Sequence, residues 1–466
     1  MIKFRELFAP KDMTEGAEWK RIIEFAFPML IGNIAQQFYN TADSIIVGRY
    51  IGDNALAAVG SALPILNLLL VLFIGIATGA GIMVAQYFGA KNREGLSRSI
   101  DVCISLTAIA SLIIMVVGPL LTRPLLGFLN TPASIIDWSE EYLIVFFLGI
   151  IGFSYFNILS GILRGLGDSV SALVFLLIST ALNVGLDIWF VARLGIGVVG
   201  VALATVIAQG ISAVLCLIKL LKMKDTFDLN LKMLALVKGY PGRLLKLGLP
   251  SGLTQAIFSL AMVVVQSLTN SFGEMVIACN VIVMRVDGFA MMPNFTFGHA
   301  MTTFVGQNIG ANKMDRVQKG TQDGMKLAVG VSTVITILIL IFGKYLMGIF
   351  TDTAELVDLS MHMMRILALG YIAMAVTQTL SGVMRGAGDT MTPMWISLIT
   401  TILLRVPIAY GMAYLTRSNA YQYGRPESIF VSLLITWVSG AIITGLFYRK
   451  NKWRRIGFID KTVAGS

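Results

Sequence analysis

Charged residues are scarce in this chain of 466 residues, at 13% of the sequence against about 25% in ordinary globular proteins. That is too little charge to cover a surface that faces water, so the composition excludes a soluble fold. Cysteine and histidine are scarcer still, with three and two residues. The cysteines are odd in number and fall inside apolar runs, which argues against a disulfide framework or a metal cluster. We expect them to pack in the interior; they are Cys103, Cys216 and Cys279.

Sequence motifs of common energy-converting and hydrolytic sites are also missing. There is no GxxxxGK(S/T) phosphate-binding loop and no HExxH sequence, so neither ATP hydrolysis nor that type of metalloprotease is supported. An intramembrane enzyme would need a nucleophile with a nearby base, and we find no such pair. We therefore predict that the protein is not an enzyme, has no cofactor, and draws its energy from an ion gradient.

What the chain has in abundance is long apolar runs. Hydrophobic residues make up 56% of the sequence and the mean hydropathy is +0.79. Runs such as "LPILNLLLVLFIGIATGAGIMV" (63–84) and "VCISLTAIASLIIMVVGPLL" (102–121) approach the ~20 residues that a bilayer-spanning helix needs. The pattern predicts an all-α polytopic membrane protein. Twelve spans are expected to begin near residues 22, 54, 99, 136, 170, 196, 244, 275, 324, 357, 391 and 427.

The distribution of basic residues predicts the orientation of these spans. With the amino terminus inside, most of the 36 lysines and arginines fall in inner segments, which favours both termini in the cytoplasm of a multi-pass protein of the cell (plasma or inner) membrane. The net charge of +10 is then explained by short loops facing anionic lipid headgroups, so membrane lipid is an expected partner and nucleic acid is not. The outer loops hold Arg49, Arg123, Arg193, Lys344, Arg417 and Arg425.

The chain repeats itself. "LRGLGDS" begins at residue 163 and "MRGAGDT" begins 221 residues later, at 384. The same offset aligns "VAQYFGAKNREG" (84–95) with "VGQNIGANKMDR" (305–316). Since each unit holds an even number of spans, the repeats enter the membrane in the same direction. We predict a first six-helix bundle over 1–221, a cytoplasmic connector over 222–243 and a second bundle over 244–466.

The paired RGxGD(S/T) loops are best explained as turns. Glycine allows the tight turn, and Asp168 or Asp389 is placed to cap the helix that follows.

Together with "NTADSIIVGRYIGDNALAAVG" (40–60) and the GQxxGA-type loops at 86–90 and 307–311, these repeated loops resemble the multidrug and toxic compound extrusion (MATE) family. The resemblance covers essentially the whole chain. It implies a V-shaped pair of six-helix bundles that exports organic cations in exchange for sodium ions or protons.

Two acids lie within the apolar runs of the first half. Ionisable side chains in a bilayer are costly, so Asp43 and Asp187 are functional candidates at similar depth in the outer half. Asn183 shares a helix face with Asp187, and Thr205 on the next span is placed to reach the same depth. These oxygens suit a sodium ion, and two carboxyl groups sharing a site also suit a proton. The alternative is that both acids are protonated and only satisfy helix contacts. The resemblance implies a cation site at these four residues and adds Asn157. The predicted spans place Asn157 nearer to the inner side of the membrane than the other four.

The second half lacks this set, because Val264 or Val265, Leu404 and Ile408 stand at the corresponding positions. It carries Asp287 instead, which is a candidate either for substrate contact or for an intramembrane ion pair. We expect the arginines of these spans to be structural and assign no role to the histidines. These residues are Arg285, Arg365, Arg405, His299 and His362.

The function predicted from these features is a monomeric, cation-coupled antiporter that exports small organic cations or drugs by alternating access. A flippase for lipid-linked oligosaccharide or another amphipathic lipid is the alternative.

Overall fold

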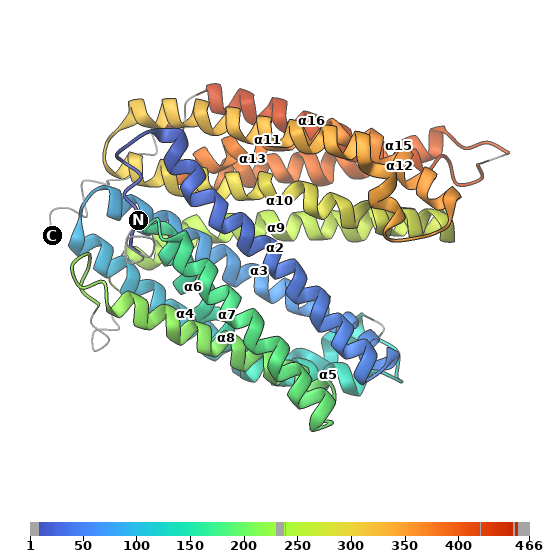
Figure 1. Ribbon diagram of the computed structural model, residues 1–466, viewed down its shortest axis with the longest axis horizontal. Helices are drawn as coiled ribbons and strands as arrows, with labels where there is room; N and C mark the ends of the chain where they lie inside the picture. The colour runs from blue at the N-terminus through green and yellow to red at the C-terminus, as the bar shows by residue number, and fades with distance from the viewer. Residues whose placement is uncertain are drawn as a thin grey trace. The chain divides into compact units, whose positions relative to one another are not determined.

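The computed structural model describes residues 9–129, 131–229, 237, 239–419, 421–450 and 453–454. All regular secondary structure in these residues is helical (Figure 1). Among the residues that the structure describes, eight helices are long and apolar enough to cross a membrane. The number rises to ten if each of two bent helix pairs is counted as one span. The all-α prediction is confirmed.

By internal contacts the chain forms two compact units. Unit 1 comprises residues 1–12 and 27–252, and unit 2 comprises residues 13–26 and 253–466. Two long helices therefore divide their residues between the units, and each division lies beside an internal proline, Pro28 or Pro250. Proline removes a helical hydrogen bond, so both helices are weakened next to the point where they pass from one unit to the other. The predicted boundary at 222–243 separates sequence repeats rather than compact units and stays a prediction.

In unit 1, the bent α5–α6 segment packs against α3, α4 and α8, and α7 packs against α8 (Figure 1). The core is formed by apolar side chains that include Leu66, Leu143 and Val201. The helices are α2 (Glu18–Tyr50), α3 (Asp53–Gly89), α4 (Arg93–Phe128), α5 (Ile136–Leu148), α6 (Ile150–Gly165), α7 (Ser169–Asp187), the π-helix η1 (Ile188–Arg193) and α8 (Val198–Leu221).

In unit 2, α13 packs against α10, α11 and α16 (Figure 1). Its core includes Val283, Leu367 and Phe430. The helices are α9 (Tyr240–Ser271), α10 (Glu274–Gly310), α11 (Met314–Gly348), α12 (Ala354–Ala368), α13 (Gly370–Gly386), α14 (Met391–Ser397), the π-helix η2 (Leu398–Leu404), α15 (Arg405–Leu415) and α16 (Glu427–Arg449).

The turns recur at the offset found in the sequence. Gly167 and Gly388 have φ of 82° and 92°, a region that glycine enters without steric cost. Asp168 accepts a hydrogen bond from the backbone N–H of Ser171 at 2.9 Å, and Asp389 accepts one from Thr392 at 3.0 Å. The RGxGD loops are therefore capped turns. The bends between α5 and α6 (54°) and between α12 and α13 (44°) also fall at equivalent positions.

Residues of each GQxxGA-type loop bind the chain near the start of a long helix, which is α9 in unit 1 and α2 in unit 2. In unit 1, Arg243 Nη2 donates to Gln86 Oε1 at 3.0 Å, and Tyr87 stacks on Tyr240; we call these four residues the α9 clamp. The α2 clamp of unit 2 binds residues 13–18. There the Met13 N–H donates to Gln307 Oε1 at 2.8 Å, and the other holding residues are Asn308, Lys313, Arg316 and Lys319.

Candidate functional site

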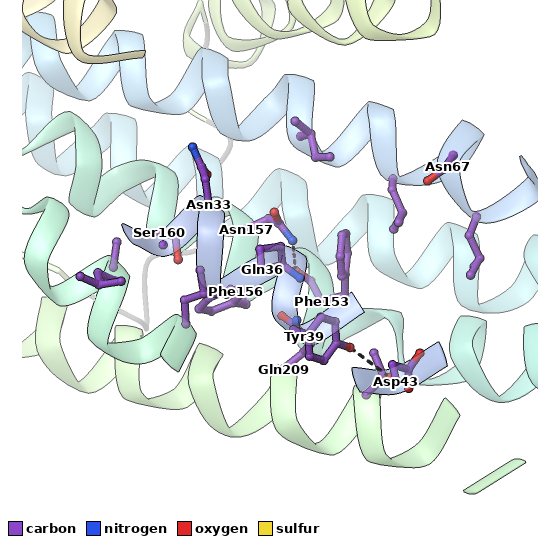
Figure 2. Close-up of a pocket in the computed structure, with 18 of the residues that line it drawn as sticks. Asn33, Gln36, Tyr39, Asp43, Asn67, Phe153, Phe156, Asn157, Ser160 and Gln209 are labelled. Carbon is purple, nitrogen blue, oxygen red and sulfur yellow. Dashed lines mark hydrogen bonds between the residues drawn. The ribbon is translucent and has the colours of Figure 1, made fainter. Parts of the chain in front are cut away.

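A cavity of about 730 Å³ lies inside unit 1. Its wall is formed by α2, α3, α5, α6, α7 and α8, and it combines aromatic rings with amide, hydroxyl and carboxyl groups. Figure 2 shows Asp43 at one end of the view, with Tyr39 beside it, and Asn33 and Ser160 at the other. Three of the predicted residues line this cavity, namely Asp43, Asn157 and Thr205.

Asp43 and Asp187 come together from different helices. Their carboxyl groups are placed to form a hydrogen bond with each other. An ionised carboxylate only accepts hydrogen bonds, so this contact requires a shared proton, or a cation in its place. Asp187 is fully buried, and Asp43 Oδ1 has no hydrogen-bond partner among the residues that the structure describes. The pair therefore has unmet demand for positive charge.

Neutral oxygen-bearing groups surround the pair. Asn183 Nδ2 donates to Thr205 Oγ1 at 3.3 Å, and the Tyr39 hydroxyl lies 3.4 Å from the same oxygen. Asn183 lies four residues before Asp187 in α7, so both project from one helix face, as predicted. Thr205 comes from α8, which packs beside α7. Helix contacts thus assemble carboxyl, amide and hydroxyl groups suited to a hard cation.

The helix geometry changes immediately after Asp187. Residues Ile188–Arg193 form a π-helix, whose hydrogen bonds skip one more residue than those of an α-helix. Such segments are frequent at functional sites because they redirect side chains at a small cost. Asp187 is thereby positioned at the junction of two helix types.

Asn157 lies in the same cavity but apart from the acid pair. Its Nδ2 donates to the backbone carbonyl of Phe153 at 2.9 Å. In Figure 2 it lies between Ser160 and Asp43, next to Gln36. Asn157 is thus separate from the acid pair, and its depth in the membrane stays a prediction.

Asp287 occupies a different environment in α10 of unit 2. It is 8% exposed, and its Oδ1 has no hydrogen-bond partner in the described part of the chain. The neighbouring Tyr371 hydroxyl donates to Met364 Sδ at 3.2 Å. No ion pair to Arg405 forms within 4.0 Å among the described residues, although Arg405 is also buried. Arg285 and Arg365 are exposed. Asp287 thus lies beside Tyr371 without a close ion pair among the described residues, and its contact with substrate stays a prediction.

Several cavity residues were missed by sequence reasoning. Asn33 and Gln36 lie at helical spacing with the predicted Asp43 on α2, and Ser160 and Arg164 do so with the predicted Asn157 on α6. A polar stripe of this kind within an apolar segment is a readable signal. Tyr39 and Gln209 carry no comparable signal, because tyrosine and glutamine also occur singly on packed helices.

The chain forms two repeated helical bundles of a multi-pass membrane protein, and unit 1 contains a cavity beside buried acids. This architecture is that of a membrane transporter rather than an enzyme. The sequence matches the MatE family over residues 28–189 and 250–411. The chain belongs to this family, the MATE transporters.

Individual relatives agree with this assignment. The chain is 29% identical over 443 residues to "Probable multidrug resistance protein YoeA" of Bacillus subtilis (strain 168), covering 93% of this chain and 96% of the relative. It is similar to a solved MATE in the bent conformation, with a TM-score of 0.87, 25% identity and coverage of 97% and 98%. A MATE in the straight conformation gives the same TM-score and identity, with coverage of 96% and 98%.

Proposed function

We propose that the protein is a cation-coupled antiporter that exports organic cations or drugs by alternating access, with sodium or a proton as the coupling ion. The observation that carries the proposal is the contact between the Asp43 and Asp187 carboxyl groups beside a cavity of about 730 Å³. The name of the Bacillus relative, a multidrug resistance protein, supports export of drugs. We further propose that it acts as a monomer in the cell membrane with both termini cytoplasmic.

In this mechanism Asp43 and Asp187 supply the charge that binds the coupling cation. Asn183 and Thr205 supply neutral oxygens if that cation is sodium, and Asn157 contributes from lower in the cavity. If it is a proton, the two carboxyl groups share it. Asp287 is proposed to contact substrate from unit 2.

Exchange follows from competition between the two cargoes. A cation at the acid pair removes the negative charge that would attract a cationic drug into the same cavity. Each cargo therefore stabilises a different arrangement of the protein, by an amount set by its differential affinity for the two arrangements. The ion gradient then drives the drug outward.

The test is efflux of a cationic dye from vesicles that contain the purified protein. Asp43→Asn and Asp187→Asn keep the side-chain volume but remove the charge, so each is expected to abolish efflux driven by a sodium or proton gradient. Glu141→Gln is the matched control, since this acid of α5 is exposed, and it is expected to retain wild-type efflux. Internal pH and sodium, recorded during efflux, identify the coupling ion.

Gradient-driven efflux at the wild-type rate in both variants would remove the proposed cation site. Movement of a labelled lipid without movement of dye would instead support the flippase alternative.

A further inference from the structure

Arg164 is a cationic residue inside the cavity that the proposed mechanism does not use. It lies in the last turn of α6, is partly buried, and lines the cavity with Asn157 and Ser160. These three residues lie at i, i+3 and i+7, so they follow one face of the helix. The charge distribution assigns Arg164 to the inner segments, and in the structure it lines the cavity.

The Arg164 guanidinium forms no ion pair with the residues that the structure describes. Within the described part of the chain, no carboxylate oxygen lies within 4.0 Å of it. The acid nearest in sequence, Asp168, is engaged elsewhere. It accepts from the Ser171 backbone N–H at 2.9 Å and from the Ser171 hydroxyl at 2.6 Å, and it pairs with Lys219 at 3.8 Å. A partly buried guanidinium at a cavity wall favours a group of opposite charge, so an acidic partner is expected to enter the cavity.

The cavity is therefore positive at one end and acidic at the other. Figure 2 separates Ser160 from Asp43, and Arg164 lies one helical turn beyond Ser160. Along α2 the stretch from Asn33 to Asp43 measures about 15 Å. The wall between the two ends includes Phe153 and Phe156, whose rings offer stacking surface to a planar molecule.

We propose that Arg164 is a specificity-determining residue that binds an acidic group, such as a carboxylate, of the transported molecule. The substrate class this predicts is an amphoteric aromatic molecule, whose acidic group meets Arg164 while its cationic part lies toward Asp43. The inference rests on the proposed function for the direction of transport, but its binding step does not depend on the coupling ion.

The experiment uses two rhodamine dyes with one chromophore, a free carboxylate in the first and its methyl ester in the second. Both carry the cationic ring system, so only the acidic group differs. Dissociation constants are measured by fluorescence anisotropy on the purified full-length protein. Arg164→Gln is expected to weaken binding of the carboxylate dye by about 10-fold or more, the scale of a lost charge-assisted hydrogen bond. Binding of the ester should change by less than about 2-fold.

Two further variants separate recognition from structure. Arg164→Lys keeps the charge and should recover most of the affinity for the carboxylate dye. Arg385→Gln alters the same motif position in unit 2, where the guanidinium packs beside Gly298, and should leave both dyes unchanged. Each variant is checked for an unchanged thermal unfolding midpoint.

Equal weakening of both dyes by Arg164→Gln, or no affinity of the wild type for the carboxylate dye, overturns the inference. The proposed function fails separately: a wild type that binds both dyes with this dependence on Arg164, yet moves neither dye along an ion gradient, would keep the binding site and refute export.

Discussion

The α3–α6 crossing of unit 1 and the α10–α13 crossing of unit 2 are built from residues at the same positions of the two repeats. A Cβ atom added at Gly161 would lie 2.6 Å from the Ala77 carbonyl oxygen. One added at Gly382 would strike the carbonyl oxygen of Gly298, which aligns with Ala77. The helix backbones thus touch in both units, as small residues permit in membranes.

The polar interior differs between the same two units. Asp43 and Asp187 of unit 1 are in contact, whereas valine and Ile408 occupy these positions in the second repeat. Asp287 of unit 2 aligns in turn with Leu66 of unit 1. Duplication has therefore kept the residues that set helix distance and allowed those that face the interior to diverge. A packing contact is needed in each bundle, while the proposed exchange requires an ion site in one bundle alone.

The largest effect is expected from breaking the shared crossing. Gly161→Ala and Gly382→Ala should each destabilise the protein by about 3 kcal/mol or more, at the upper end of overpacking costs, because the new methyl group meets backbone. Thermal unfolding in detergent and the yield of folded protein report the loss. Gly60→Ala is the control, since an added Cβ meets nothing within 4 Å there. If one glycine of the pair tolerated alanine, the two crossings would not be equivalent.

A smaller effect is expected at the caps of the RGxGD turns. An aspartate caps the next helix in both repeats, but the cap of the first repeat has more hydrogen bonds. Asp168 accepts from both the N–H and the hydroxyl of Ser171, and Asp389 accepts from the Thr392 N–H. Asp168→Ala should therefore cost about 2 kcal/mol and Asp389→Ala about 1 kcal/mol. Unfolding midpoints of the two variants give the comparison.

Asparagine keeps the cap and removes the charge, so Asp168→Asn should lose much less than Asp168→Ala. Equal losses for both alanine variants would show that neither the Ser171 hydroxyl nor the ion pair with Lys219 adds to the cap.

Much of this architecture could be predicted from sequence, because apolar runs and turn glycines act locally. The observed helices begin close to the expected positions, and the Asn183–Asp187 face follows from helical spacing. The direct contact of Asp43 with Asp187 could not be predicted, since it depends on how α2 packs against α7. The π-helix after Asp187 has no residue signature. The position of Arg164 in the cavity wall could not be predicted either, because a basic residue beside a turn fits a loop as well as a cavity wall.

The smallest expected effect concerns the two clamps. The α2 clamp binds an acidic side chain, and the α9 clamp binds through a neutral one. The α2 clamp binds Glu18, whose carboxylate pairs with Arg316 and Lys319 of the clamp at 3.2 Å each. In the α9 clamp, Arg243 binds the neutral side chain of Gln86. Acid should therefore weaken the α2 clamp through Glu18.

Burial alone would raise the pKa of Glu18, but hydrogen bonds from its backbone N–H and Lys319, with the positive charges of Arg316 and Lys319, lower it below 4.5. A carboxyl group with a lowered pKa stabilises the fold above its unfolded pKa and loses that contribution as pH falls through the folded value. Glu18→Gln should thus cost about 1 kcal/mol at pH 7 and progressively less as the pH falls through the lowered pKa of Glu18. Thermal unfolding of the variant and wild type across this range measures the difference, with Glu141→Gln as the control acid. A cost that stayed constant with pH would mean that Glu18 contributes to the clamp through packing rather than charge.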